Sequence, residues 1–218
     1  MQFEIVGNPD YGELKVVLDV GDVVLAEAGA MSRMSGGLEM QSRMMGGFLQ
    51  AIARKLVGGE SLFVGEYTAK EEPGYVSFAP GVPGCVQHRK LNGDSLILTA
   101  GAFMACTPGI NLKPVFGGFK ALFSGEGAFY LEASGSGELF FNGYGGVIEK
   151  EIDGEYVVDT GHVVAWEPSL DYKITGMGGW KQTLFSGEGL VLRFSGQGKI
   201  WVQTRTMGNM AGWLRKYC

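Results

Sequence analysis

The chain contains three copies of one pattern, and this repetition restricts it to folds that are built from equivalent units. Residues 91–105 (LNGDSLILTAGAFMA) and 152–165 (IDGEYVVDTGHVVA) both read as a strand, a short spacer with a glycine, and a second strand. Residues 12–26 form a third copy. The glycines that we align across the copies are Gly21, Gly101 and Gly161.

The similarity continues downstream of each aligned glycine. Residues 117–127 (GGFKALFSGEG) match residues 178–189 (GGWKQTLFSGEG), and the run SGSG at 134–137 matches SGQG at 195–198. We therefore predict a single compact body of three homologous β-units with quasi-threefold symmetry and no linker between them. The predicted units are residues 1–84, 85–146 and 147–206, followed by a helical tail at 207–218.

Composition favours strands over helices. Glycine makes up 37 of the 218 residues, and the chain also has 13 Phe, 8 Tyr and 4 Trp. Dense glycine with aromatic residues is typical of many short strands that are joined by tight turns. Apolar and polar residues alternate at 128–133 and 199–205, as in strands with one buried face. The predicted fold class is all-β with one or two short helices.

Two segments have helical spacing instead. At residues 44–57, which are an addition to the first copy, apolar side chains recur every three or four positions with basic residues mostly on other faces. We weigh three roles for this face: an oligomer interface or core packing first, a separate protein partner second, and an anionic membrane surface third. The tail has a similar stripe. The candidate oligomer or partner residues are Met45, Phe48, Leu49, Ile52, Leu56 and Trp213.

Hydropathy, cysteine spacing and net charge argue against several classes of protein. No run of about 18 apolar residues is present, as a membrane-spanning helix would need. The first residues lack the pattern of a secretory signal. Three widely spaced cysteines, Cys85, Cys106 and Cys218, fit reduced thiols better than a disulfide framework, so we expect a cytoplasmic protein. The formal net charge of −5, without a basic stripe, argues against DNA binding.

Two pairs of polar residues could carry chemistry, and for each pair a structural role is the stronger interpretation. Cys85 and His88 have the spacing of two metal ligands, but a structural zinc site needs about four, so we expect no metal. His162 follows an aligned glycine and lies near Asp159, yet the other two copies lack a histidine there. We therefore predict no catalytic residue and no cofactor. A small-molecule or metal-dependent enzyme with a site at these four residues is the alternative.

Several segments resemble one known family. They are EAGAM at 27–31, GGF at 46–48, RKL at 54–56, GESLF at 59–63 and VDTGHVVA at 158–165. Their order resembles the mitochondrial biogenesis family called altered inheritance of mitochondria, member twenty-four, over nearly the whole chain. The resemblance implies a fold similar to the tryptophan RNA-binding attenuation protein, a short double-stranded β-helix type, and a homo-oligomer. It assigns no catalytic residue.

The fold analogy raises RNA binding as a further alternative. Single-stranded RNA is bound by exposed aromatic side chains beside basic ones. Phe119-Lys120 and Trp180-Lys181 are two such pairs at one place in the repeat, but burial of the aromatic ring between units explains them more simply. The sequence thus favours a non-catalytic homo-oligomeric β-scaffold or binding module, a trimer or a multiple of three, over an enzyme or an RNA-binding protein.

Overall fold

Antiparallel strands account for most of the computed structural model, which describes residues 1–44, 63–117, 129–176 and 190–217. Within these ranges the protein is all-β apart from the helix α3 (Met207–Leu214) and the short 3-10 helix η2 (Thr160–His162), as predicted.

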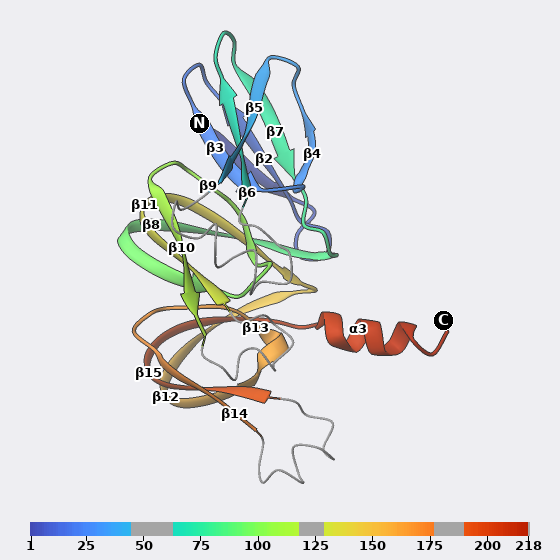
Figure 1. The fold of residues 1–218 in the computed structure, drawn as a ribbon, viewed down its shortest axis with the longest axis vertical. Coiled ribbons are helices and arrows are strands. Elements are labelled where there is room, and N and C mark those ends of the chain that lie inside the picture. Colours follow the sequence, from blue (N-terminus) through green and yellow to red (C-terminus); the bar gives the residue numbers. More distant parts are fainter. Residues whose placement is uncertain (45–62, 118–128, 177–189, 218) are drawn as a thin grey trace.

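The strands lie in three layers along the long axis (Figure 1). The upper layer contains β1 (Gln2–Val6), β2 (Glu13–Leu18), β3 (Val23–Glu27), β4 (Met31–Met34), β5 (Leu38–Met44), β6 (Phe63–Ala69) and β7 (Gly74–Phe78). The middle layer contains β8 (Gly84–Leu98), β9 (Phe103–Cys106), β10 (Ile110–Phe116) and β11 (Phe129–Tyr144). The lower layer contains β12 (Val147–Asp159), β13 (Val163–Trp166), β14 (Asp171–Gly176) and β15 (Leu190–Gln203).

The middle and lower layers share one pattern of strand pairing. In the middle layer the long strands β8 and β11 pair over most of their length, and in the lower layer β12 and β15 do the same. β9 and β10 pair with β11, just as β13 and β14 pair with β15. The two layers therefore repeat one another in topology as well as in sequence.

The upper layer uses the same pairings, but each of its two long strands is interrupted by a turn, at 19–22 and at 70–73. β2 pairs with β7 and β3 pairs with β6, so two short strands stand where the other layers have one long strand. β4 pairs with β7 and β5 with β6, at the places that β9 and β10 take on β11. β1 is an additional edge strand on β2.

One alignment that we made from the sequence is wrong. β4 lies on β7 with a register shift after Met31, as β9 lies on β11 with a shift after Phe103. Gly29 precedes Met31 by two residues, as Gly101 precedes Phe103, so Gly29 and not Gly21 is the counterpart of Gly101. Gly29, Gly101 and Gly21 have φ angles of 88°, 77° and 91°. The upper layer contains two turns that have a glycine at positive φ, Gly21 and Gly29. The comparison of sequence segments therefore aligned the wrong turn with Gly101.

The glycine-rich runs at 134–137 and 195–198 lie inside long strands rather than ahead of them. The register of β11 against β8 shifts between Ser134 and Ser136, where Gly135 has a φ of 120°. Gly196 has a φ of 114° at the matching place in β15. Positive φ at these glycines bends a continuous strand, as in a β-bulge, instead of ending it.

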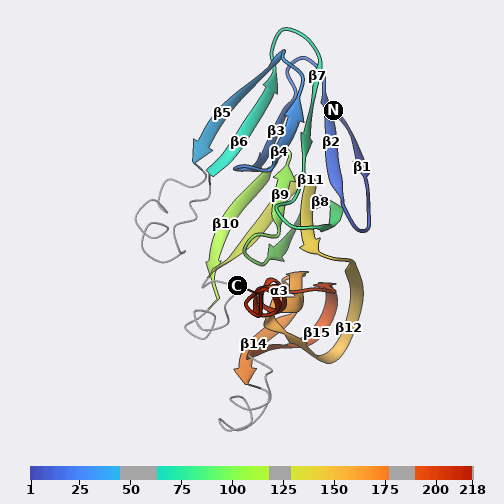
Figure 2. The same cartoon turned by 90° about the vertical axis from the view of Figure 1, so that its right-hand side faces the viewer.

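Two short strand contacts connect the layers. In the upper joint β3 pairs with β9, and in the lower joint β8 pairs with β13. Through them one sheet follows the open path β12-β15-β13-β8-β11-β9-β3-β6-β5, with β12 at its lower end (Figure 2). The residue pairs are Leu25–Cys106 and Ala26–Ala105 in the upper joint, and Ile97–Trp166 and Leu98–Ala165 in the lower joint.

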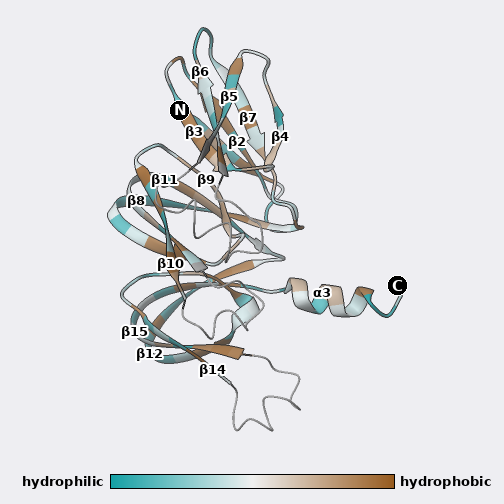
Figure 3. Ribbon diagram, viewed as in Figure 1, coloured by the Kyte–Doolittle hydropathy of each residue, from teal (hydrophilic) through white to brown (hydrophobic). Residues whose placement is uncertain are grey.

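The hydrophobic core runs through both joints. The largest cluster of buried residues combines Leu25 of the upper layer, many residues of the middle layer, and Trp201 of the lower layer. A second cluster fills the upper layer and includes Phe140 of β11, and a third fills the lower layer and includes Tyr130. Each layer therefore shares its core with the next, and Figure 3 shows apolar strand segments in all three.

The predicted tail helix is confirmed, since α3 spans most of residues 207–217. The predicted helix at 44–57 falls almost entirely outside the described residues. Its first residue, Met44, ends strand β5 instead. Among the helices of the described ranges, none has the length and apolarity that crossing a membrane requires.

We expect Gly101→Ala to lower the free energy of unfolding by about 1–2 kcal/mol, because an L side chain is strained at positive φ. Gly101 has a φ of +77°, and no heavy atom lies within 4 Å of the place that a Cβ would take, so the backbone alone accounts for the cost. Gly36→Ala is the matched control, since its Cβ would also meet open space and its φ is not in the strained range. Chemical denaturation measures both variants, and equal stabilities would contradict the prediction.

Candidate functional site

Cys85 and His88 cannot share a metal ion. Both belong to β8, and a spacing of three residues places their side chains on opposite faces of the strand. The Cys85 thiol is buried, and its sulfur accepts a hydrogen bond from Nε2 of Gln87 at 2.8 Å. The His88 side chain is 30% exposed on the outer face. Across the described part of the chain, no three His, Cys, Asp or Glu side chains are grouped as metal ligands.

His88 belongs to a surface cluster that is centred on Glu138. Its Nε2 lies 2.6 Å from Oε2 of Glu138, and Nζ of Lys90 lies 3.7 Å from Oε1 of the same carboxylate. The rings of Phe3 and Phe140 lie 4.6 Å and 5.1 Å from the imidazole, measured between centroids. Because Phe3 comes from β1, this cluster packs the added edge strand against the β8–β11 pair.

Asp159 and His162 have separate partners at one turn. Oδ1 of Asp159 accepts a hydrogen bond from the backbone N of Gly161 at 2.9 Å and so caps η2. Nδ1 of His162 lies 2.7 Å from the backbone oxygen of Gln203 at the end of β15. The Gln203 side chain donates to the Gly161 oxygen and accepts from the backbone N of Tyr144, both at 2.8 Å. His162 therefore helps to fasten η2 to the ends of β15 and β11.

Sequence reasoning missed Arg89, which links the middle and lower layers. Its Nη2 lies 2.8 Å from Oε1 of Glu167 and 3.2 Å from Oδ2 of Asp94. The guanidinium also lies over the Trp201 ring, 5.2 Å from the centroid. Oε2 of Glu167 accepts from the backbone N of Lys199 at 2.9 Å, which anchors the carboxylate. No local motif could have found this contact, because its partners are far apart in the sequence.

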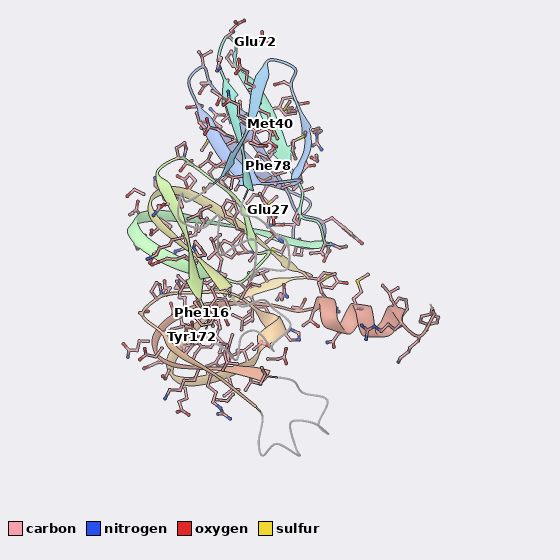
Figure 4. All side chains as sticks on the ribbon, in the orientation of Figure 1. Glu27, Met40, Glu72, Phe78, Phe116 and Tyr172 are labelled. Carbon is pink, nitrogen blue, oxygen red and sulfur yellow. The ribbon has the colours of Figure 1, made fainter. Side chains whose placement is uncertain are left out.

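The helix α3 projects from the body between the middle and lower layers (Figures 1 and 4). Oγ1 of Thr206 caps it by accepting from the backbone N of Asn209 at 3.1 Å. None of its residues is buried, and the predicted Trp213 is 55% exposed. The Met210 side chain touches the body, because its Sδ lies 2.8 Å from Oη of Tyr144 in β11. The exposed apolar residues of the helix and the residues just after it, here called the α3 face, are Met207, Met210, Trp213, Leu214 and Tyr217.

The other residues of the predicted partner surface lie outside the described residues, so that surface stays a prediction. They are Met45, Phe48, Leu49, Ile52 and Leu56. The two aromatic–lysine pairs that we weighed for RNA binding, 119–120 and 180–181, also fall outside the described ranges.

A protein of known structure shares this fold. The X-ray crystal structure of a Streptococcus pyogenes protein superposes with a TM-score of 0.83 at 29% identity, and the match covers 100% of this chain and 99% of that chain. An uncharacterized protein of Streptococcus pyogenes serotype M6 is 30% identical over 226 residues, which are 100% of this chain and 91% of the relative. Fold and comparisons together define an all-β protein with bacterial relatives. The family model described as mitochondrial biogenesis AIM24 matches residues 3–205, and the chain belongs to this family, as the resemblance in its sequence predicts.

We expect His162→Ala to lower the free energy of unfolding by about 1 kcal/mol, the usual net worth of one hydrogen bond. His162→Asn should lose less, because the Asn amide nitrogen reaches nearly the place of the imidazole Nδ1. Urea denaturation measures both variants. Stability unchanged in His162→Ala would contradict the structural role that its 2.7 Å contact assigns.

Burial raises the pKa of the Cys106 thiol to about 12. Because the thiolate is the reactive form, we expect Cys106 to resist iodoacetamide at pH 8 in the folded protein and to react after unfolding in guanidinium. Mass spectrometry of tryptic peptides locates the label. Modification of Cys106 in the folded protein at the rate of the unfolded control would contradict this expectation.

Proposed function

We propose that the protein is a non-catalytic β-scaffold that assembles with further copies of itself, as a trimer or a multiple of three, and offers surfaces to a protein partner. The observation that carries the proposal is the exposed state of α3. A capped helix with a continuous apolar stripe stands outside the body, and none of its residues is buried.

Such a helix needs a covering surface to be stable. Isolated helices shorter than about 12–15 residues are marginal in water, and α3 has only 8 residues. Gly208 and Gly212 lie within it, and each costs roughly 1 kcal/mol relative to alanine. Helical stability in proteins comes mainly from packing of an apolar face. The α3 face supplies one, with Trp213 at its centre, and tryptophan is enriched among the residues that carry binding energy.

The roles of the polar residues support a scaffold over an enzyme. His162, Asp159 and His88 each bond to groups that position strands or turns. Catalytic groups instead converge on a space that a substrate can enter. The exposed surface of α3 is apolar, which fits recognition of another macromolecule.

The proposal includes the architecture that the repeat predicts. The shared pairings of the three layers support three homologous units, with Gly29 in place of Gly21 as the first reference glycine. Their relation by a quasi-threefold axis, and the likeness to the tryptophan RNA-binding attenuation protein, stay predictions of the sequence. A reducing compartment such as the cytoplasm is supported by Cys85 and Cys106, which are free and buried.

We expect Trp213→Asp to weaken self-association by roughly 30-fold, because a buried tryptophan at an interface contributes about 2 kcal/mol. Native mass spectrometry of the untagged full chain over a range of concentrations measures the populations of monomer and oligomer. The circular dichroism spectrum should stay near that of the original protein, because residue 213 is exposed in the single chain and its replacement removes no packing within the body.

Tyr11→Asp is the matched control, since Tyr11 is an aromatic residue that is 75% exposed and lies far from α3 in the sequence. It should leave assembly unchanged. A chain that stays monomeric at every concentration and retains no protein partner would refute the scaffold proposal. Reproducible extra mass of a small ligand or metal on each subunit would favour the enzyme alternative instead.

A further inference from the structure

The upper and lower joints obey one rule of register. The turn glycines that serve as reference points are Gly29 in the upper layer, Gly101 in the middle layer and Gly161 in the lower layer. In each joint, the residue three positions before one glycine pairs with the residue four positions after the glycine of the next layer. These pairs are Ala26 with Ala105, and Leu98 with Ala165.

The same rule identifies two halves of a third joint. Val158 lies three positions before Gly161, and Arg33 lies four positions after Gly29. The adjacent pair would be Val157 with Met34, by analogy with the second residue pair of each joint. Among the described strands β12 pairs only with β15, and β4 pairs only with β7, so both halves are open edges.

The two halves cannot meet within one chain. β12 lies in the lower layer and β4 in the upper layer, and both views place the middle layer between them (Figures 1 and 2). The strand path is open for the same reason, with β12 at one end. No described strand of the same chain pairs with either edge, and the edge that fits β12 by register is the β4 of another copy.

Side-chain exposure agrees with an unfilled joint. Leu25, which occupies this place in the upper joint, is 3% exposed, whereas its counterpart Val157 on β12 is 40% exposed. On the receiving strand, Met31 is 38% exposed. Ile97 at the same place in the lower joint is partly buried, so Val157 is more exposed than either of its counterparts in the internal joints.

We propose that β12 of one copy pairs antiparallel with β4 of a second copy, with Val158 opposite Arg33 and Val157 opposite Met34. This inference rests on the proposed self-assembly, since it names the contact that joins the copies. The two surfaces differ, so the contact is head-to-tail, and its repetition closes a ring or extends a filament. Pairing also satisfies the open backbone groups of both edges.

Arg33 distinguishes this third joint from the two inside the chain. Both internal joints have alanine at its position, Ala105 and Ala165, and both alanines are fully buried. Arg33 is exposed and holds Glu13, with Nη1 2.6 Å from Oε2 of that carboxylate. A charged pair at the rim makes the joint between copies more polar than the internal ones. This composition suits an interface that forms after folding.

The test compares Val157→Glu, Met34→Lys and the double variant in the full chain by native mass spectrometry. We expect each single variant to weaken self-association by more than roughly tenfold, because an unpaired charge then enters an apolar joint. The double variant should recover most of the association. In a head-to-tail contact, the carboxylate introduced at position 157 of one copy faces the ammonium introduced at position 34 of the next.

Val17→Glu is the matched control. Val17 is a valine with 36% exposure, but β2 is paired on both sides by β1 and β7, so it offers no open edge. It should assemble like the original protein. Circular dichroism and the melting temperature confirm that each variant folds, which matters for Met34 because it packs against the core.

The outcomes separate this inference from the scaffold proposal. If the original protein and Val157→Glu form the same oligomer, the joint is refuted while self-assembly stands. If Val17→Glu dissociates as fully as Val157→Glu, the effect is not specific to the joint, and the inference is refuted as well. If the original protein is monomeric throughout, both proposals fail.

A disulfide test measures the register directly. Opposed residues of antiparallel strands have Cα atoms about 4.5–5.5 Å apart, which is within the range of a disulfide. Met34→Cys with Val157→Cys, in a Cys218→Ser background, should therefore give covalent products at integer multiples of the chain mass under mild oxidation. Either single cysteine variant in that background should give none. Products in equal amount from a single variant, or none from the double variant of an assembled protein, would refute the predicted register.

Discussion

The backbone groups of open strand edges are the constraint on which this structure depends. A strand at the edge of a sheet exposes unpaired N–H and C=O groups, and it must be covered, paired or left to the solvent. Within the chain, pairing satisfies two such edges: β3 pairs with β9, and β8 pairs with β13. Each joint is only two residue pairs long, yet the largest core cluster passes through both. The layers therefore share buried residues as well as a sheet, and the joints position everything else.

Glycine makes this arrangement possible at several described turns and bends. Gly29 and Gly101 supply the positive φ that lets the chain turn from one strand to the next. Gly135 and Gly196 instead lie within the long strands β11 and β15, which bend there without being interrupted. A bent strand can pair with one neighbour along its first half and another along its second.

Polar side chains reinforce the same contacts. Arg89 ties β8 to Glu167 beside the lower joint, and His162 fastens η2 to the end of β15. His88 and Phe3 pack β1 onto the β8–β11 pair. Residues that seemed candidates for chemistry are therefore engaged in holding the layers together. Among the described residues, α3 and the open edges of β4 and β12 are the surfaces that we propose for recognition, which is why the proposed function concerns assembly.

Local patterns in the sequence determined the strands and the tail helix, because period-2 and period-3.6 spacing act over a few residues. They also sufficed to identify the family. They could not separate Gly21 from Gly29, since both turns have the same local preference for positive φ. They placed Cys85 and His88 together, although alternation along β8 puts their side chains on opposite faces. Arg89 with Glu167, the two joints and the two open edges depend on register between strands that are distant in the chain. Such pairings are chosen by packing and backbone hydrogen bonds in three dimensions, so only the tertiary structure decided them.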